Sequence, residues 1–437
     1  MNAPYKTLTR YLCVLFLAFF MQEPTQGKSP LDLLPNRGIA SGNTAQSAIL
    51  ARKGWIRVYV GSSLSAQVRV SGDGYQVLID GHSAGSGRGN ATVTGRGDNV
   101  VVSQGRQNIA SGHEVTIVPT LKNGIVGIGE HNYRGRLVAI ASGKGISLVN
   151  EVMIDDFLKG MLDAEIGGDA PMEALKAQAI CARSELIRKL VKPPHRVNGY
   201  DFCNSTHCMV YKGISAENTA CVQAVNETLG LALIANGNVL DAVFHNVCGG
   251  TTAGAEEVWD SDPVEGLVPV LDNGHGRSAP NLSNDRDAAS FINSADSSLC
   301  CHPSNPTYPN YAKKYFRWEK NMSAEQVARI AGVGSLRDIR VIQRMPSGRV
   351  RKLQVTGTRG AKVFEKELPI RNAFDLWSGF FVVDMNSNGV TFRGAGNGHG
   401  VGLCQMGARS MAARGAKYTQ ILKNYFPQAS IQRIYKP

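Results

Sequence analysis

Short runs of alternating apolar and polar residues dominate the segment that begins at Trp55. The clearest of these runs are residues 55–60, 67–70, 75–79, 99–103 and 114–118. Alternation places the apolar side chains on one face of a strand, and clusters of Gly, Asp and Asn between the runs are typical of tight turns. We therefore expect a strand-rich N-terminal domain over residues 55–145, built from short antiparallel strands.

The pattern changes to helical spacing near residue 146. Apolar positions between Ile154 and Leu162 indicate one helix, and a stronger helix begins at Pro171, with Asp169 placed to cap it. The stronger helix carries an apolar stripe at steps of three and four residues, which predicts a buried face. The residues of this stripe are Leu175, Ala179, Ala182, Leu186 and Leu190.

Strands and helices alternate in the rest of the chain. Strand patterns return at 231–234, 239–244, 339–342 and 351–355, and two helices are expected at 404–415 and 418–425. Residues 270–311 are rich in Asn, Ser, Asp and Pro, so we expect them to form a loop insertion over the surface. The predicted fold class is α+β, with a mixed α/β domain over residues 146–437.

The first 27 residues have the layout of a secretory signal. Lys6 and Arg10 precede an apolar run over 11–21 that is too short to span a bilayer, and Gly27 is a plausible cleavage point. An uncleaved anchor is the alternative. Residues 28–54 read as a linker. We predict an exported protein, periplasmic, cell-wall or extracellular, with no membrane span in its mature form.

Charge narrows the class of partner only a little. The 437 residues include 47 Lys and Arg against 35 Asp and Glu, a formal net charge of +12 spread along the chain. A diffuse basic surface suits a polyanion such as a cell wall with its carboxylates, or it only aids solubility. The usual nucleic-acid-binding motifs are missing from the sequence, so no nucleic-acid partner is expected.

Glu165 is the first candidate for chemistry. It lies between two apolar helices, immediately before the turn at Gly167-Gly168. A carboxyl that is partly screened from water there would keep its proton, as a general acid must. The alternative is a solvated glutamate at a helix end, and spacing alone favours that alternative.

Four potential metal ligands fall within fourteen residues: His195, Cys203, His207 and Cys208. Two imidazoles and two thiolates would complete a tetrahedral zinc site, which would be structural because no position is left open for water. A Cys203–Cys208 disulfide is the rival interpretation in an oxidising compartment, and free thiols are a third.

A glycine-rich loop at 397–407 is a further candidate, because glycines flank His399 and let a ligand approach the backbone. A tight turn with a packed histidine is the alternative. Cys248 and Cys404 could also act as thiol nucleophiles with His245 or His399, which would make the chain a peptidase or transpeptidase.

Taken in order along the chain, five segments resemble motifs of the SpoIID/LytB family of cell-wall proteins. The strand-rich segment from Trp55 also resembles that family's amino-terminal region. There are two departures: Met209 stands where the family usually has Gln, and the 270–311 insertion is larger than usual. The five segments are 148–160, Glu165 with 173–184, 200–213, 248–250 and 398–408.

The resemblance implies a catalytic domain with a cleft between its lobes and a lytic transglycosylase or muramidase activity on peptidoglycan glycan strands. It assigns the catalytic acid to Glu165, which would act as acid and then as base, and it supports zinc at the Cys-His loop; no organic cofactor is expected. The residues expected to line the substrate groove are Lys176, Arg183, Tyr211, His399 and Gln405.

Two points stay open at this level. Lys176 and Arg183 would lower the pKa of Glu165 if they lay beside it, which opposes acid function, so burial would have to dominate. Some family members are amidase enhancers, so the alternative function is a non-catalytic peptidoglycan-binding protein that stimulates a separate cell-wall amidase.

Overall fold

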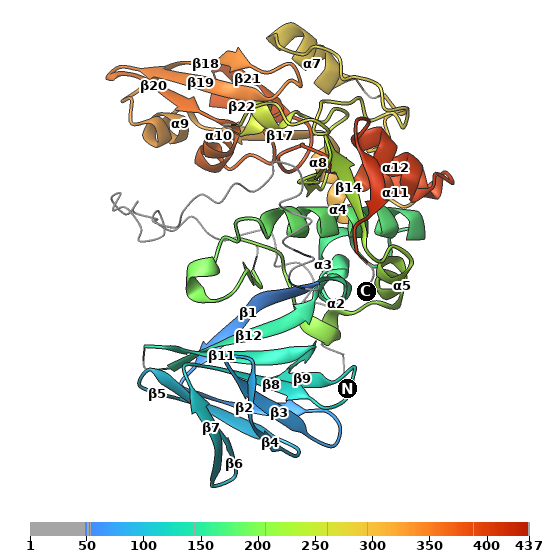
Figure 1. The fold of residues 1–437 in the computed structure, drawn as a ribbon. Helices are drawn as coiled ribbons and strands as arrows, with labels where there is room; N and C mark the ends of the chain where they lie inside the picture. Colours follow the sequence, from blue (N-terminus) through green and yellow to red (C-terminus); the bar gives the residue numbers. More distant parts are fainter. Residues whose placement is uncertain are drawn as a thin grey trace, which may run out of the picture. The chain divides into compact units, whose positions relative to one another are not determined.

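The computed structural model describes residues 49, 52, 54–143, 145–205, 207–259, 261–294, 296–387 and 389–435 (Figure 1). The predicted signal at 1–27 and nearly all of the predicted linker at 28–54 lie outside these residues. Among the helices within the described ranges, none has the length and apolar character needed to cross a membrane.

Two sheets form the strand-rich part of the molecule. The first has seven strands in the order β13-β1-β12-β11-β8-β3-β4. Its strands are β1 (Trp55–Ser63), β3 (Tyr75–Ile79), β4 (His82–Gly87), β8 (Glu114–Pro119), β11 (Arg136–Ser142), β12 (Gly145–Met153) and β13 (Phe202–Cys203).

The second sheet has six strands in the order β10-β9-β2-β5-β6-β7. Buried side chains of both sheets belong to one hydrophobic cluster. The strand pairs are antiparallel except for β1 with β13, so the predicted series of short antiparallel strands is confirmed. The strands of the second sheet are β2 (Ser65–Val70), β5 (Ala91–Arg96), β6 (Asn99–Gln104), β7 (Gln107–Gly112), β9 (Ile125–Ile128) and β10 (His131–Arg134).

Strand β12 carries the chain from the sheet into the helices. It lies between β1 and β11 in the first sheet, and α2 (Ile154–Lys159) begins directly after its last residue. The boundary that we predicted at residue 145 therefore falls at the start of an inner strand. Strand β12 therefore links the strand-rich region to the helical region, and the first helix begins where this inner strand ends.

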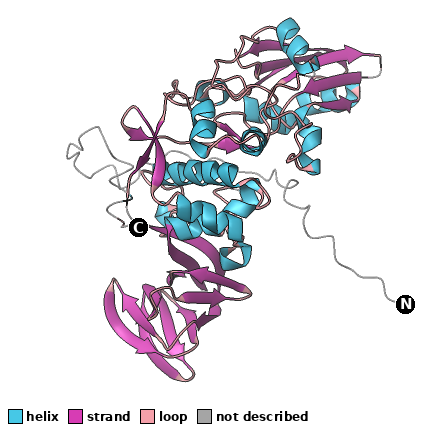
Figure 2. Cartoon of the chain, turned by 90° about the vertical axis from the view of Figure 1, so that its right-hand side faces the viewer, coloured by secondary structure: helices cyan, strands magenta, loops and turns pink. Residues whose placement is uncertain are grey.

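Helix α4 (Met172–Lys189) is the centre of the helical region, shown in cyan in Figure 2. All five residues of the predicted stripe are buried, and so are most of their neighbours, because other helices cover α4 on several sides. The helices that pack on it are α2, α3 (Leu162–Ile166), α5 (Thr219–Glu227), α11 (Gln405–Ala413) and α12 (Tyr418–Tyr425).

The predicted cap of α4 is wrong. Pro171, in an extended conformation, occupies the N-cap position, and it makes no side-chain cap hydrogen bond. The Asp169 carboxylate instead accepts hydrogen bonds from Arg409 of α11, at 3.1 and 2.9 Å. Local spacing predicted that Asp169 caps the helix, but its carboxylate pairs with Arg409, which is distant in sequence.

A second group of strands and helices has its own hydrophobic cluster, which includes Val327, Leu353, Phe374 and Phe392. Its strands form two three-stranded sheets, β18-β19-β20 and β17-β22-β21. The elements are β17 (Trp318–Met322), α9 (Ala324–Ala331), β18 (Leu336–Arg344), β19 (Val350–Gly357), β20 (Gly360–Glu365), α10 (Glu367–Phe374), β21 (Phe381–Asn386) and β22 (Gly389–Gly394).

Short elements connect these regions. Strand β14 pairs with β15 and β24, and β16 pairs in parallel with β23. These elements are η2 (Arg196–Asn198), η3 (Gly213–Ala216), β14 (Leu231–Ala235), β15 (Asn238–Val239), β16 (Phe244–His245), α6 (Ala255–Val258), α7 (Asp285–Asn293), α8 (Asn310–Phe316), β23 (Leu403–Cys404) and β24 (Ser430–Arg433).

The segment 270–311 is mostly irregular, as predicted, but it is not confined to the surface. It contains α7, whose N-terminus is capped by the side chain of Asn284. Its cysteines, Cys300 and Cys301, have almost no exposed surface. Composition indicated loops because Asn, Ser and Asp favour caps and turns, but the same segment also supplies buried side chains to the core.

Candidate functional site

Glu165 lies near the end of α3, a single short helix held by two buried side chains. Leu162 and Ile166, four residues apart, face the core, while Glu165 is only partly buried. Gly167 ends the helix with a φ of 84°, a left-handed conformation that glycine adopts without strain. The sequence thus anchors one face of α3 and leaves Glu165 beside the turn.

Burial raises the pKa of Glu165 to about 7. The neighbouring carboxylate of Glu185 also raises it, and the ammonium group of Lys189 lowers it. The carboxyl of Glu165 makes no hydrogen bond or ion pair to any residue that the structure describes. A carboxyl that is half protonated near neutral pH and free of partners can give up a proton and take it back.

The surroundings of Glu165 are acidic overall. Lys189 is paired with Glu185 of the same helix, at 2.5 Å. Asp241, whose pKa burial raises, also lies within the field of Lys189. Lys189 thus acts on three carboxyls, those of Glu165, Glu185 and Asp241, and Arg188 also acts on Asp241.

The two cations that we expected beside Glu165 are paired elsewhere. Lys176 binds Glu173 at 2.8 Å and Glu227 at 2.6 Å. Neither Lys176 nor Arg183 is among the groups that shift the pKa of Glu165. The conflict between acid function and two nearby cations, which the sequence raised, does not arise in this structure.

Arg183 has no exposed surface. Its guanidinium binds Asp155 at 2.7 Å and donates to the carbonyl oxygen of Leu231 at 3.0 Å. The hydroxyl of Tyr435 donates to the other oxygen of Asp155, at 2.8 Å. This burial argues against the predicted contact with substrate and favours a structural role, tying α4 to α2 and β14.

Tyr211 is also in the interior, with 2% of its surface exposed. Its hydroxyl donates to Asn150 at 2.9 Å, and its ring lies 4.5 Å from that of Phe157. Its position argues against the predicted place in a substrate groove. Tyr211 instead attaches the end of the Cys-His loop to β12 and α2, so it positions the loop from behind.

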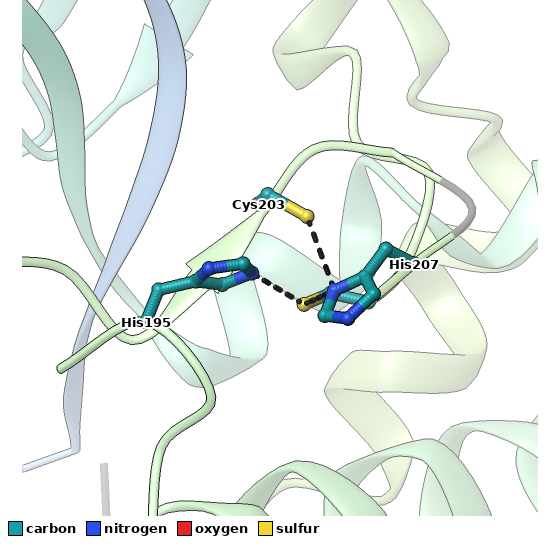
Figure 3. A group of neighbouring side chains, drawn as sticks. His195, Cys203 and His207 are labelled. Atoms are coloured by element: carbon teal, nitrogen blue, oxygen red, sulfur yellow. Dashed lines mark hydrogen bonds between the residues drawn. The ribbon is translucent and has the colours of Figure 1, made fainter. Parts of the chain in front are cut away.

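The four residues of the Cys-His loop converge, as the sequence predicted. Figure 3 shows the side chains of His195, Cys203 and His207 pointing toward one another. Cys208 Sγ lies 3.4 Å from Nε2 of His195 and 3.3 Å from Nδ1 of His207, and Cys203 Sγ lies 3.7 Å from that same Nδ1. All four donor atoms lie within 4.8 Å of one another, which fits a tetrahedral S2N2 metal site.

The first sheet holds this loop in place. Strand β13, which contains Cys203, pairs in parallel with β1. The buried carboxylate of Asp201 accepts from the backbone amide of Arg57 at 2.9 Å and from Arg52 at 2.6 Å. Met209, the departure from the family pattern, is 4% exposed and packs into the core. Lys189 influences the pKa of both Cys208 and Glu165, which places the loop and Glu165 around the same ammonium group.

The glycine-rich loop is fixed by the pairing of β16 with β23. A Cβ atom at Gly400 would collide with the guanidinium of Arg349, which donates to the carbonyl oxygen of His399 at 3.2 Å. Nδ1 of His399 accepts from the amide of Val401 at 3.0 Å, and burial lowers the pKa of His399 well below its usual range. His399 is thus a neutral imidazole, and its ring lies 5.2 Å from the half-exposed ring of Trp259.

Gln405 is the first residue of α11, directly after the glycine-rich loop, and it is 5% exposed. Arg409 lies one turn further along the same face of the helix. Its guanidinium donates to the carbonyl oxygen of Ile166 at 3.0 Å. The closing motif and the helix of Glu165 are therefore joined through Arg409. Sequence reasoning missed this residue, although an arginine within an apolar helix was a usable signal.

The two cysteines proposed as nucleophiles, Cys248 and Cys404, are both completely buried. A substrate cannot reach either sulfur in this structure, which argues against the peptidase and transpeptidase interpretation. All eight cysteines within the described residues are free thiols here, Cys203 and Cys208 included.

Two family models match different parts of the chain. Residues 142–234, which contain Glu165 and the Cys-His loop, match the family model described as Stage II sporulation protein. Residues 253–402, which contain His399, match a domain of unknown function (DUF8618).

Three proteins are similar in sequence to this chain over about two thirds of its length. An uncharacterised protein of Brachyspira hyodysenteriae is 30% identical over 295 residues, which is 67% of this chain and 70% of that protein. The amidase enhancer of Bacillus subtilis is 27% identical over 292 residues, 63% of this chain and 40% of that protein. Stage II sporulation protein D of Bacillus amyloliquefaciens is 25% identical over 296 residues, 65% of this chain and 75% of that protein.

The order of motifs, the matched model and these relatives define a protein built around a stage II sporulation protein D domain. The chain belongs to the SpoIID/LytB family.

Proposed function

We propose that this protein cleaves the glycan strands of peptidoglycan outside the cytoplasm, as a lytic transglycosylase with Glu165 as its acid and base. The proposal joins family membership to the properties of one side chain. Its substrate would be strands from which the stem peptides have been removed, in remodelling of the cell wall.

The observation that carries the proposal is the environment of Glu165. This carboxyl is partly buried, it has no hydrogen-bond or ion-pair partner among the described residues, and burial raises its pKa to about 7. A general acid works best when its pKa lies near the working pH. A glutamate that only stabilised the fold would be expected to hold a partner, as Glu173 holds Lys176.

A single carboxyl suffices for this reaction. Protonated Glu165 gives its proton to the bridging oxygen as the bond from C1 of the first sugar to that oxygen breaks. The ionised carboxylate then takes the proton of the C6 hydroxyl of the same sugar, and that oxygen closes onto C1. The product is a 1,6-anhydro end, no water is consumed, and Glu165 is protonated again. Enzymes that use water instead need a second carboxyl at a set separation.

We propose that the Cys-His loop binds a structural Zn2+ through His195, Cys203, His207 and Cys208. The donor set and its convergence support zinc, and burial and the neighbouring His207 lower the pKa of His195, which keeps that imidazole in its metal-binding form. With four protein ligands the ion would shape the loop near Lys189 and leave the proton transfers to Glu165.

The closing motif would supply further substrate contacts. His399 is neutral and lies against the half-exposed ring of Trp259, a combination suited to hydroxyl groups and the apolar face of a sugar. Arg409 joins the helix that begins at Gln405 to the helix of Glu165. We therefore retain His399 as a proposed substrate residue, but not Arg183, Tyr211 or Gln405, which are buried.

A second candidate is that the protein binds peptidoglycan and stimulates a separate amidase. It is favoured by the relative named amidase enhancer, of which this chain covers 40%. In that case the raised pKa of Glu165 would have no catalytic use.

The test is digestion of purified, peptide-free glycan strands, followed by mass spectrometry for anhydromuramyl ends. We expect product from the wild type, none above background from Glu165→Gln, and wild-type product from Glu227→Gln, which removes an exposed carboxylate of α5. Equal background product from all three proteins would reject the enzyme. Stimulation of an added amidase by both the wild type and Glu165→Gln would then support the enhancer.

A further inference from the structure

Four acidic side chains from distant parts of the chain meet in the interior, away from the Cys-His loop. They are Cys248, Asp272, Cys301 and Cys404, and none has any exposed surface. Their donor atoms all lie within 4.8 Å of one another. Cys248 begins the turn after β16, Asp272 and Cys301 belong to the 270–311 segment, and Cys404 caps α11.

The distances in this cluster are close to those of a tetrahedral metal site. Sγ of Cys248 lies 3.5 Å from Sγ of Cys301 and 3.2 Å from Oδ2 of Asp272. With zinc–sulfur bonds of about 2.3 Å and a zinc–oxygen bond of about 2.0 Å, tetrahedral angles put two sulfurs about 3.8 Å apart and sulfur and oxygen about 3.5 Å apart. Outward shifts of a few tenths of an ångström would admit the ion.

Backbone amides point at the sulfur atoms. The amide of Cys248 donates to Sγ of Cys404 at 3.2 Å, the amide of Gly250 to Sγ of Cys248 at 3.3 Å, and the amide of Gly407 to Sγ of Cys404 at 3.4 Å. Amide donors stabilise the thiolate form of cysteine, which is the form that binds metal. A thiol that only filled space in a core would not need such donors.

The carboxylate of Asp272 is oriented in the same way. The buried hydroxyl of Tyr425 donates to Oδ1 at 2.6 Å, and the amide of Cys301 donates to Oδ2 at 2.9 Å. Hydrogen bonds to a ligating carboxylate fix its direction and are a usual feature around metal ions. A Cβ atom at Gly407 would collide with the hydroxyl of Tyr425, so glycine permits this approach.

Among the described residues, no arginine or lysine donates a hydrogen bond to the four acidic groups, although the charges of Arg317 and Arg349 act on Cys248 through space. The nearby guanidinium of Arg317 donates to the backbone carbonyls of Gly249, Ile292 and Phe316, and none of its hydrogen bonds goes to the four acidic groups. Acidic groups without water must either keep their protons or share a cation, because an isolated buried charge is costly. A divalent ion would balance several of these groups at once.

We propose that Cys248, Asp272, Cys301 and Cys404 form a second, closed zinc site of S3O type. Three sulfur ligands favour zinc over the oxygen-preferring Mg2+ and Ca2+. Four protein ligands leave no open position, so the site is structural.

The location of this site indicates what it does. It connects the Cys-Gly-Gly turn, two points of the 270–311 segment and the first turn of α11. That helix carries Gln405 and Arg409, and Arg409 contacts the helix of Glu165. The ion would hold the closing motif at a fixed distance from the rest of the fold. This inference does not depend on the proposed cleavage reaction.

A Cys248–Cys301 disulfide is the main rival, because those sulfurs are neighbours. It would leave Cys404 with two backbone amide donors, and the carboxylate of Asp272 with two buried donors, but no metal. The two chemistries differ in mass and metal content, so they can be separated directly.

The experiment is metal analysis of the full-length protein, purified without chelators from cells supplied with zinc. We expect two zinc ions per wild-type chain, and one each in Cys203→Ser and in Cys301→Ser. Cys300→Ala removes the adjacent buried thiol, which is not in the cluster, and should keep two. One zinc in the wild type that Cys203→Ser abolishes and Cys301→Ser leaves unchanged would overturn the second site. A Cys248–Cys301 disulfide-linked peptide, found by mass spectrometry after the free thiols of the denatured, unreduced chain are alkylated, would overturn it too.

A second measurement serves if Cys301→Ser does not fold. In Cys203→Ser with His207→Ala, the buried cluster keeps its native residues and the loop site is lost. X-ray absorption at the zinc edge of this variant should then show three sulfur ligands and one oxygen ligand. A spectrum without zinc, or one dominated by nitrogen and oxygen ligands, would contradict the proposal.

Discussion

Arg409 donates a hydrogen bond from Nη1 to the backbone carbonyl of Ile166 at 3.0 Å, across 243 residues of sequence. Ile166 is the residue after Glu165, so this contact fixes the end of the helix that presents the proposed acid. The same guanidinium also binds the exposed carboxylate of Asp169. One side chain thus connects the two motif regions that the family resemblance brings together.

Arg409→Met is expected to reduce kcat more than it changes KM. The substitution leaves the carbonyl of Ile166 without its partner, at a cost of about 1–3 kcal/mol in unfolding free energy, and lets α3 move. Asp169→Asn is the control, because it removes only an exposed partner and should cost less than about 1 kcal/mol. Steady-state release of anhydro ends and urea unfolding measure both effects; equal results for the two variants would contradict the positioning role.

The pH dependence of cleavage should follow the protonation of Glu165. Its pKa is raised to about 7, so the protonated acid is lost as the pH rises through that value, and kcat/KM should fall on the alkaline side. Glu185→Gln removes a neighbouring negative charge, so it should move this limb to lower pH; Lys189→Met should move it to higher pH. Rate profiles between pH 5 and 9 test this, and a limb that stays in place in both variants would exclude Glu165 as the titrating group.

Glu165→Gln should unfold less readily than the wild type at alkaline pH. The folded state holds the proton of Glu165 up to about pH 7, whereas the unfolded chain loses it near 4.5. Wild-type stability contributed by this group therefore falls as the pH rises between these two values. The full shift corresponds to about 3 kcal/mol, and less is expected because solvent reaches the carboxyl.

Urea unfolding of both proteins at pH 4.5 and pH 8.5 measures this difference. Relative to the wild type, the unfolding free energy of Glu165→Gln should be higher at pH 8.5 than at pH 4.5. A gap between the two proteins that does not change with pH would mean that the pKa of Glu165 is not raised in the folded state.

Arg183 should prove to be a residue of the fold. Arg183→Met leaves Asp155 buried without its cation, so we expect a loss of about 3–5 kcal/mol in unfolding free energy. Lys176→Met, on the same helix, removes a lysine that is paired with the partly exposed carboxylates of Glu173 and Glu227. It should lower the unfolding free energy by less than about 1 kcal/mol. A variant of Arg183 with unchanged stability and a raised KM would restore the substrate contact that the sequence suggested.

Several elements could be predicted from sequence because their cause is local. The helix over Tyr418–Tyr425 has the predicted limits, and the stripe from Leu175 to Leu190 is buried as its spacing required. The four ligands of the Cys-His loop also converge, because they lie within fourteen residues and the chain between them is short. Periodicity and short separation carry this information without knowledge of the rest of the fold.

Other features depended on partners distant in sequence. Asp169 was expected as a helix cap, but Arg409 binds it; Arg183 was expected at a substrate, but Asp155 binds it. Cys301 was placed in a surface loop, yet it lies beside Cys248 and Asp272 in the core. A side chain's type and spacing do not say which of several distant groups will meet it.

The sequence by itself determined the alternation of strands and helices, the order of the family motifs and the identity of Glu165 as the candidate acid. Only the tertiary structure decided that Glu165 stands beside Glu185 and a shared Lys189, away from Lys176 and Arg183, and that four acidic groups meet around Cys248. The physical reason is range: hydrophobic periodicity acts between neighbours along the chain, whereas pKa values and metal-ligand sets depend on which groups packing brings within a few ångströms.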